Sequence, residues 1–443
     1  MRVLVIGASG KVGKALLKSL RIRSRDDVEA VGTFFSHPDP TLFHLDVTNH
    51  EQVKDTLFKL RPDVVVQCSA ITYAERCEEE PELAWKVNVE STRHLVQVCR
   101  DLNSKLVFIS SDYVFDGERG NYSEVDEPNP INVLGKTKVE GERLVSRLPK
   151  HLVIRTAVVL DAAPSSKSFF RQVVERVGRG ENMTVPNDQV ENPTLATNLA
   201  DVITDLILQE ENGIFHVAGA TPIDRYNLTL RICNTLGLEE DLVRGVPSDS
   251  LGQKAKRPKN LALSVNKVKG VVKTPLLDLD GILEDLVKEY YSYLPKGLYV
   301  FPLRVHADPR GTLTVLVSQG RPDAPNADVI REVYVSSIPE RGIRRAGHKH
   351  NRTDEFFNVE SGTAKFVLVD DREGMPSGRE PVSIILSSKY PSVLSVPAGI
   401  YHAVVSMKPG TRIISMASKP YEPGSPDEVK LELEAFGPEL NYG

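Results

Sequence analysis

The sequence has little of several features that mark specialised classes of protein. Its 443 residues contain four cysteines, which lie far apart and form no CxxC pair, so we expect reduced thiols rather than disulfides. No apolar run approaches the roughly 18–20 residues that are needed to span a bilayer. The net charge of −5 gives no general attraction for nucleic acid or acidic membranes. We therefore expect a cytoplasmic protein that binds neither nucleic acid nor a membrane.

The patterns that are present indicate two domains. The first half alternates short β-branched runs, such as Arg2 to Ile6, with helical patterns, such as Lys11 to Leu20, which is typical of an α/β fold with a doubly wound parallel sheet. From about Leu298, short alternating segments such as Val382 to Leu386 are separated by turn residues, which favours an all-β barrel or sandwich. We predict an α/β domain over 1–292, a linker over 293–300 and an all-β domain over 301–443.

A glycine-rich turn at the start of the chain predicts a dinucleotide site. Gly7, Gly10 and Gly13 follow the first strand and open the first helix, so the backbone amides of a Rossmann-type domain can face a pyrophosphate. Asp46 follows the second strand region, where it meets the adenine or caps the loop. The second strand ends without a carboxylate for a ribose 2′-hydroxyl, which favours NADP over NAD without excluding NAD.

Several stretches of the first half carry a specific resemblance. They are Pro62 to Val66, Glu79 to Val89, Ser111 to Gly117, Asn192 to Thr194, and Arg257 with Pro258. Through them, residues 1 to about 292 resemble the extended short-chain dehydrogenases, above all dTDP-4-dehydrorhamnose reductase. They also resemble a non-catalytic relative of that enzyme, the β regulatory subunit of methionine adenosyltransferase.

The resemblance implies roles for individual residues. Ser111 matches the catalytic Ser/Thr of the family, Lys138 matches its catalytic lysine, and Asn88 lies near the nicotinamide. Tyr113 and Arg257 fall near the sugar nucleotide. The candidate cofactor-binding residues are Gly7, Gly10, Lys11, Val12, Gly13, Asp46, Val47, Ser69, Ala70, Asn88 and Lys138.

One residue that the family requires is absent. The family places a tyrosine four residues before the lysine, and this chain has Leu134 at that position. The tyrosine gives its proton to the reduced carbonyl, and leucine has no proton to give. Removing a general acid typically costs about two to four orders of magnitude in rate. We therefore expect the domain to bind NADP(H) but to reduce a substrate slowly, with Tyr113 or a water bound to Ser111 as the nearest substitute.

The second half contains the spacing of a metal site. His348 and His350 are two apart, so both point to one face of a strand, and Glu355 and His402 follow at the spacing of the two cupin motifs. Three imidazoles and a carboxylate suit Zn, Fe, Mn or Ni. We predict a divalent metal in a cupin domain, which is a double-stranded β-helix.

This half also resembles cupins that act on sugar nucleotides. The supporting stretches are Asp308 to Gly311, Arg345 to His348, Val369 to Arg372, and Lys419 to Tyr421. They are similar to dTDP-4-dehydrorhamnose 3,5-epimerase and to the cupin half of the bifunctional capsular-polysaccharide reductase. The resemblance implies that His348 is the catalytic base and that Arg310 contacts the substrate. The epimerase needs no metal, and its acidic tyrosine would fall near Ile414 to Met416, where this chain has none.

The two resemblances together suggest a bifunctional enzyme of deoxysugar or polysaccharide biosynthesis. A dTDP-4-keto-6-deoxyhexose would be epimerised or isomerised in the cupin and reduced in the Rossmann-type domain. The alternatives are a regulatory protein that senses NADP or a nucleotide sugar, and a cupin enzyme whose first domain is a scaffold. Exposed strand edges of cupins often pair, so we expect a homodimer.

Overall fold

The chain forms two compact units. The computed structural model describes all residues except 24–27, 295–296, 310, 320–324, 373–380, 423, 438–439 and 441–443. Unit 1 comprises Met1–Asp161, Val185–Asn227 and Gly245–Ile282, and unit 2 comprises Ala162–Thr184, Leu228–Arg244 and Leu283–Gly443. Unit 2 therefore takes in segments that precede residue 293, and the domain boundary at 292 stays a prediction.

A seven-stranded parallel sheet forms the centre of unit 1. Its strand order is β11-β6-β5-β4-β1-β2-β3. The bounds are β1 Arg2–Ile6, β2 Glu29–Phe34, β3 Phe43–His44, β4 Val64–Gln67, β5 Lys105–Ser111, β6 His151–Thr156 and β11 Gly213–His216. The order runs outward in both directions from β1 and β4, which confirms the doubly wound fold that the alternating pattern predicts.

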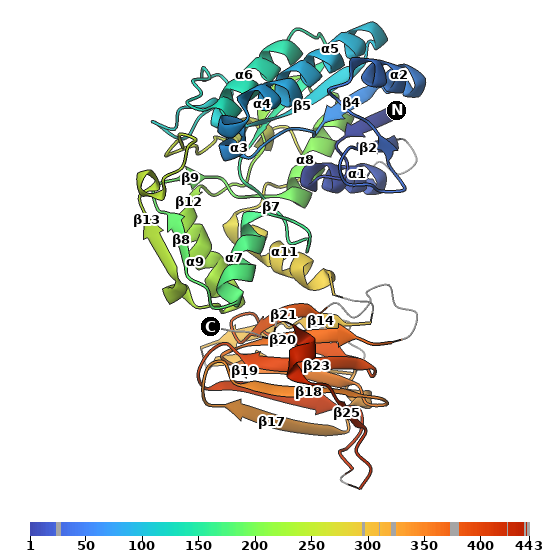
Figure 1. The fold of residues 1–443 in the computed structure, drawn as a ribbon, viewed down its shortest axis with the longest axis vertical. Coiled ribbons are helices and arrows are strands. Elements are labelled where there is room, and N and C mark those ends of the chain that lie inside the picture. Colours follow the sequence, from blue (N-terminus) through green and yellow to red (C-terminus); the bar gives the residue numbers. More distant parts are fainter. Residues whose placement is uncertain are drawn as a thin grey trace. The chain divides into compact units, whose positions relative to one another are not determined.

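Helices cover both faces of this sheet (Figure 1). They are α1 Lys11–Arg23, α2 His50–Leu60, α5 Ser91–Leu102, α6 Val133–Val145 and α8 Ala196–Leu208. The helices α3 Ala74–Glu79 and α4 Pro81–Trp85 pack in a separate cluster with α6. In β1, Val3 and Val5 pack in the cluster that contains the apolar side chains of α1 and α8. Leu4 and Ile6 point the other way and pack with those of α2, α5 and α6. Both faces of β1 are buried, which is why this strand is a continuous apolar run.

Further strands and helices lie between residues 159 and 292. They are β7 Val159–Leu160, β8 Met183–Pro186, β9 Val190–Glu191, β10 Thr194–Leu195, β12 Ile223–Asp224, β13 Val243–Val246, α7 Phe169–Gly178, α9 Arg225–Leu236, α10 Asn266–Lys269 and α11 Leu279–Ser292. The pairs β7–β10, β9–β12 and β8–β13 form small two-stranded sheets. Among the helices that the structure describes, none is both long enough and apolar enough to cross a lipid bilayer.

The β-rich part of unit 2 contains two five-stranded antiparallel sheets, with orders β14-β22-β19-β24-β17 and β21-β20-β23-β18-β25. The bounds are β14 Tyr299–Pro302, β15 Val305–Asp308, β16 Gly311–Thr314, β17 Glu332–Ile338, β18 Arg344–His350, β19 Glu355–Ser361, β20 Thr363–Asp370, β21 Val382–Ser387, β22 Ser392–Val396, β23 Ile400–Ser406, β24 Thr411–Ala417 and β25 Glu428–Lys430. This is the architecture expected of a cupin domain.

One predicted strand begins later than its sequence suggests. The apolar pattern predicts a strand from Val329 to Val335, whereas β17 begins at Glu332. The side chain of Asn326 accepts a hydrogen bond from the backbone N–H of Asp328 and caps a short 3-10 helix. A local cap of this kind competes with strand pairing, and the apolar period alone does not reveal it.

Candidate functional site

The glycine-rich turn has the close backbone approaches that a dinucleotide site needs. Gly7 has a φ of +78°, which a side chain would strain, and a Cβ there would lie 2.9 Å from the backbone nitrogen of Ser69. A Cβ on Gly13 would lie only 2.3 Å from the carbonyl oxygen of Gly7. Both positions therefore need glycine, and α1 begins at Lys11 with its first amides directed at the turn.

A cavity of about 430 Å³ lies beside this turn, next to the carboxyl ends of β1, β4, β5 and β6. Such crevices are where open α/β sheets bind ligands. The predicted residues that line it are Gly7, Gly10, Lys11, Val12, Gly13, Ala70, Ser111, Tyr113, Lys138 and Arg257. Most of the cofactor and substrate residues that the sequence predicts therefore lie in one cavity.

Four predicted cofactor residues lie outside the lining of this cavity. Asp46 caps its own loop, because its Oδ1 accepts hydrogen bonds from the backbone N–H and the hydroxyl of Thr48. Val47 is buried in the core, and the hydroxyl of Ser69 is buried without a hydrogen-bond partner.

Asn88 is the fourth of these residues. It does not line the cavity but supports the segment that forms its wall. Its Oδ1 accepts a hydrogen bond of 2.8 Å from the N–H of Ile71, and its Nδ2 donates one of 3.0 Å to the carbonyl of the same residue. The amide therefore holds the segment after β4 in place, next to the lining residue Ala70.

Lys138 and Leu134 lie on consecutive turns of α6 and both face the cavity. Lys138 donates a hydrogen bond of 2.8 Å to the carbonyl of Ile109, and its burial lowers its pKa from 10.5 to about 8. Leu134 is 4% exposed and packs in an apolar cluster with Cys77 and Ala255. The position that holds the family's tyrosine thus has an apolar side chain in partly apolar surroundings.

Tyr113 and Arg257 meet in the same cavity. Nη1 of Arg257 donates a hydrogen bond of 2.9 Å to the hydroxyl of Tyr113, and Nη2 pairs with Glu75 at 2.9 Å. Burial raises the pKa of Tyr113 to about 12. The pair offers a phenol and a guanidinium to a polar ligand, as the resemblance implies.

Three charged residues of the cavity were missed by sequence reasoning. Asp112, Glu191 and Arg225 line it, and Arg225 pairs with Glu191 at 2.7 Å. Ser111 donates a hydrogen bond of 2.8 Å to Oδ1 of Asp112. Asp112 lies inside the stretch Ser111 to Gly117, which carries the resemblance, so the sequence could have marked it as a candidate site residue.

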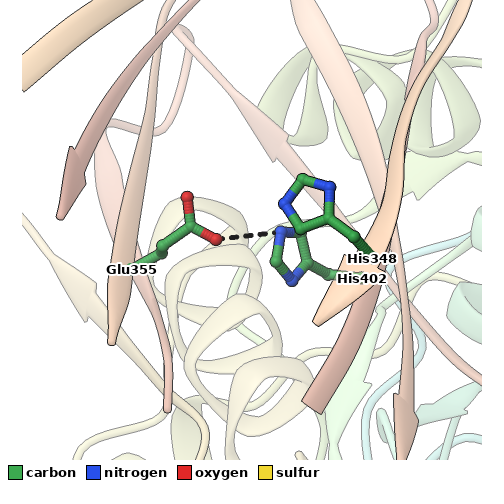
Figure 2. Close-up of side chains that lie close together, drawn as sticks. All are labelled: His348, Glu355 and His402. Atoms are coloured by element: carbon green, nitrogen blue, oxygen red, sulfur yellow. Dashed lines mark ion pairs between the residues drawn. The ribbon is translucent and has the colours of Figure 1, made fainter. Parts of the chain in front are cut away.

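The second site lies in the cupin domain and is drawn in Figure 2. There, His348 and His402 lie side by side across from Glu355. The ligand atoms of these three residues lie within 4.8 Å of one another. Nε2 of His402 is 3.0 Å from Oε2 of Glu355. The three residues come from β18, β19 and β23, and pairing of β18 with β23 sets His348 opposite His402.

His350 joins this group through Glu355, because its Nε2 lies 3.3 Å from Oε2 of the same carboxylate. That oxygen is buried, and neither imidazole donates a hydrogen bond to it, although both are at ion-pair distance. Burial opposes ionisation of Glu355, but the two histidines outweigh it and lower the pKa of the carboxyl. Burial and the neighbouring His402 lower the pKa of His348 to about 4, so its imidazole is neutral.

A tyrosine completes the cupin site. The hydroxyl of Tyr334 donates a hydrogen bond of 2.9 Å to Oε1 of Glu355 and thereby fixes the orientation of the carboxylate. Tyr334 and Glu355, with Lys419 and Tyr421, line a cavity of about 440 Å³ that His348 and His350 also line. Arg310, the predicted substrate contact, lies outside the described residues.

Comparison with known proteins identifies both halves. Residues 1–292 match the family model of the RmlD substrate binding domain, and residues 295–439 match that of dTDP-4-dehydrorhamnose 3,5-epimerase. A probable low-salt glycan biosynthesis reductase of Haloferax volcanii is 31% identical over 66% of this chain and 100% of its own length. The methionine adenosyltransferase 2 subunit beta of Danio rerio is 30% identical over 60% of this chain and 84% of its own length.

Solved structures agree for the first half. A hypothetical dTDP-4-dehydrorhamnose reductase from Sulfolobus tokodaii is 36% identical, has a TM-score of 0.58, and aligns over 63% of this chain and 99% of its own. The dTDP-4-dehydrorhamnose reductase of Bacillus anthracis, solved in complex with NADP, is 26% identical with a TM-score of 0.60 and aligns over 65% and 99%. The chain therefore belongs to the family of the RmlD substrate binding domain, and its residues 295–439 match the family model of dTDP-4-dehydrorhamnose 3,5-epimerase.

Proposed function

We propose that the chain is a bifunctional nucleotide-sugar enzyme that acts on a dTDP-4-keto-6-deoxyhexose. The observation that carries this proposal is that both halves are similar to proteins named for one compound: residues 295–439 match the model of dTDP-4-dehydrorhamnose 3,5-epimerase, and a relative of the first half is named dTDP-4-dehydrorhamnose reductase. Fusion of both to one chain supports a shared substrate, and each half has a cavity of about 430–440 Å³ that is lined by apolar and by charged side chains.

In the reductase half, we propose NADP(H) as the hydride donor. The NADP complex of the Bacillus anthracis relative supports this cofactor. Gly7, Gly10 and Gly13 let the turn approach the pyrophosphate, and Lys138 is positioned to hold the nicotinamide ribose. Ser111 faces the reacting carbonyl. Because Leu134 provides no proton, we expect slow turnover, well below the rate of about ten per second that is typical of enzymes.

In the cupin half, we propose that the site moves a proton at a carbon next to the sugar ketone. In a metal-free site, His348 is half-buried, neutral and lines the cavity, so it is able to accept a proton without first losing one. A bound metal ion would instead occupy its nitrogen and make His348 a ligand. Tyr334 and Lys419 lie in the same cavity and offer hydrogen bonds to the sugar oxygens.

We further propose that the cupin holds a divalent metal ion, with His348, His350, Glu355 and His402 as ligands. The fit rests on Oε2 of Glu355, which is buried, lacks a hydrogen-bond donor and lies at 3.0 and 3.3 Å from two imidazole nitrogens. A bound Zn, Fe, Mn or Ni ion would polarise the ketone as a Lewis acid. Elemental analysis after purification without chelator tests this, with His402→Ala as the variant that should lose the ion. If wild type contains no stoichiometric metal, His348 acts as a metal-free base.

A heavy-water experiment tests the cupin activity. Wild type should incorporate deuterium next to the ketone of a dTDP-4-keto sugar, and His348→Ala should abolish the incorporation. Gly13→Ala should leave it intact, since this change lies in unit 1 and distant changes act independently. Absence of exchange in wild type over a panel of such sugars would contradict the proposed isomerase.

A regulatory role is the second candidate for the first half. The apolar surroundings of Leu134 and the likeness to methionine adenosyltransferase 2 subunit beta favour it. Titration with NADPH, followed by an oxidation assay with the same sugar panel, separates the two. Tight cofactor binding without any oxidation would support the regulatory role.

We also propose a homodimer that forms through β17. This strand lies at the end of its five-stranded sheet and exposes Val333 at 59% and Val335 at 50%. An exposed apolar edge is an unpaired surface that a second copy of the chain can cover. Light scattering of Val335→Lys against wild type measures the effect, and an unchanged mass would contradict this interface.

A further inference from the structure

We propose that Asp112 is the proton source that replaces the missing tyrosine, and that it acts through the hydroxyl of Ser111. The inference rests on the proposed reductase function and concerns the same cavity. It assigns a role to a residue that lies within the matched stretch Ser111 to Gly117 but for which the sequence analysis predicts none.

The position of Asp112 follows from the end of β5. Ser111 is the last residue of this strand, and Asp112 opens the short 3-10 helix Asp112–Val114. Both side chains belong to the cavity that Leu134 and Lys138 also line. Oγ of Ser111 lies 2.8 Å from Oδ1 of Asp112, so a proton can pass between them without movement of the backbone. Ser111 donates this bond when Asp112 is ionised; when Asp112 carries its proton on Oδ1, the carboxyl donates to Ser111 and leaves the serine hydroxyl proton for the substrate.

The surroundings of Asp112 favour its neutral, protonated form. The residue is 2% exposed, and its Oδ2 is buried without a hydrogen-bond partner, which is costly for an ionised carboxylate. Burial, and then the negative charge of Glu191, raise its pKa well above 3.8. Ser111, the N–H of Tyr113 and the guanidinium of Arg225 lower it by less. Asp112 thus holds a proton at a pH where an ordinary aspartate has lost it.

Tyr113 is the other group with an acidic proton near the cavity, and it is the weaker candidate. Its hydroxyl accepts a hydrogen bond from Arg257, and burial raises its pKa to about 12. A general acid works best when its pKa lies near the operating pH. Asp112 also lies within hydrogen-bond distance of the Ser111 hydroxyl, whereas the Tyr113 hydroxyl is bonded to Arg257.

The proposed step transfers one hydride and one proton to the ketone. Hydride leaves C4 of NADPH and bonds to the carbonyl carbon, and the C=O π electrons move to the oxygen. That oxygen takes the hydroxyl proton of Ser111, while Ser111 takes the proton of the Asp112 carboxyl. NADP⁺, the alcohol and an ionised Asp112 remain, and Asp112 regains a proton from water before the next turnover.

The test uses the full-length chain, NADPH and a dTDP-4-keto-6-deoxyhexose. Asp112→Asn keeps the shape of the side chain but removes its acidic proton, and we expect a loss of about 100-fold or more in the rate of NADPH oxidation. Asp55→Asn, an exposed change on α2, is the matched control and should keep the wild-type rate. NADPH binding by Asp112→Asn should be unchanged, which shows that the cavity remains folded.

The decisive measurement is rescue by the double variant Asp112→Asn with Leu134→Tyr. A tyrosine at 134 lies one helical turn before Lys138, where the family has its acid, so it should restore most of the lost rate. A purely structural defect at Asp112 would not be rescued in this way. Wild type should also lose rate as pH rises through the raised pKa of Asp112, and the double variant should lack this decline.

Each outcome has a distinct meaning. If wild type reduces the sugar and Asp112→Asn keeps its rate, the assignment of Asp112 is wrong while the reductase function stands. The assignment is also wrong if Asp112→Asn is slow and its double variant, although it binds NADPH, stays slow and shows the wild-type pH profile. Absence of reduction by wild type with every sugar overturns the reductase function and this inference together.

Discussion

Replacing Lys138 by methionine should make the cofactor-free protein more stable while weakening its binding of NADP(H). Lys138 is buried, and its pKa falls from 10.5 in a free side chain to about 8. This shift corresponds to about 3 kcal/mol of unfavourable free energy for the charged form in the folded state at pH 7. Methionine fills a similar volume without a charge.

The expected gain is smaller than that figure because the lysine also makes favourable contacts. Its hydrogen bond to the carbonyl of Ile109 is lost in the variant, at a cost of about 1 kcal/mol, as is the contact of its ammonium group with the Phe108 ring at 5.0 Å from the ring centroid. We therefore expect Lys138→Met to raise the free energy of unfolding of unit 1 by about 2 kcal/mol at pH 7. Lys136→Met, an exposed change on the same helix, is the control and should have little effect.

The effect has a defined pH dependence. The folded state has the lower pKa, so it binds fewer protons than the unfolded state between about pH 8 and 10.5. The contribution of Lys138 to the wild-type free energy of unfolding therefore rises with pH across that window. The gain in stability from Lys138→Met should shrink over the same window. It should be fully present below about pH 8, where the lysine is charged in both states.

Urea titration followed by tryptophan fluorescence measures these quantities. The chain has one tryptophan, Trp85, and it lies in unit 1, so the signal reports the unit that contains Lys138. Calorimetric titration with NADPH gives the affinity. A variant that is less stable than wild type at pH 7, or equally stable at all pH values, would refute the reasoning, because it would show that the buried ammonium carries no cost.

Three further changes test other parts of the structure. Gly13→Ala should abolish NADP(H) binding, since its Cβ would lie 2.3 Å from the carbonyl oxygen of Gly7, and unaltered affinity by titration would contradict this geometry. Arg155→Leu should cost about 3–5 kcal/mol in urea unfolding, because it leaves the buried Glu142 carboxylate without its 2.8 Å partner. Leu134→Tyr alone should increase the rate of NADPH oxidation with a 4-keto sugar, and a rate equal to wild type would mean that proton supply does not limit turnover.

The fold of this chain was largely predictable because its strongest signals are local. The apolar run Arg2 to Ile6 gives β1 as predicted, and the helix expected from Lys11 to Leu20 extends to Arg23. The pattern of buried apolar runs separated by amphipathic helices predicts the parallel sheet, and no tertiary contact has to be known for this prediction. Ends of elements were less predictable, since caps such as Asn326 depend on a single side chain.

The sites were predictable where their residues are close in sequence. The glycine turn and the His348–His350 pair were found because strand and turn geometry fix what such short spacings can do. Asp112 was missed for the opposite reason. Its position lies within the matched stretch Ser111 to Gly117, but the rise of its pKa depends on burial and on Glu191, which is distant in sequence.

Tyr334 illustrates how strand pairing can supply a residue that a motif lacks. The resemblance to the epimerase places a tyrosine near Ile414 to Met416, and the sequence has none there. In the structure, β17 pairs antiparallel with β24, and Tyr334 stands directly opposite Ser415. Directly opposed residues of an antiparallel pair project to the same face of the sheet, so the phenol lies on the face of Ser415, the middle residue of that range. Its hydrogen bond to Glu355 then ties it to the cavity of the cupin site. The neighbouring strand therefore supplies a phenol to the site where β24 has none, and only the register of β17 against β24 could reveal this.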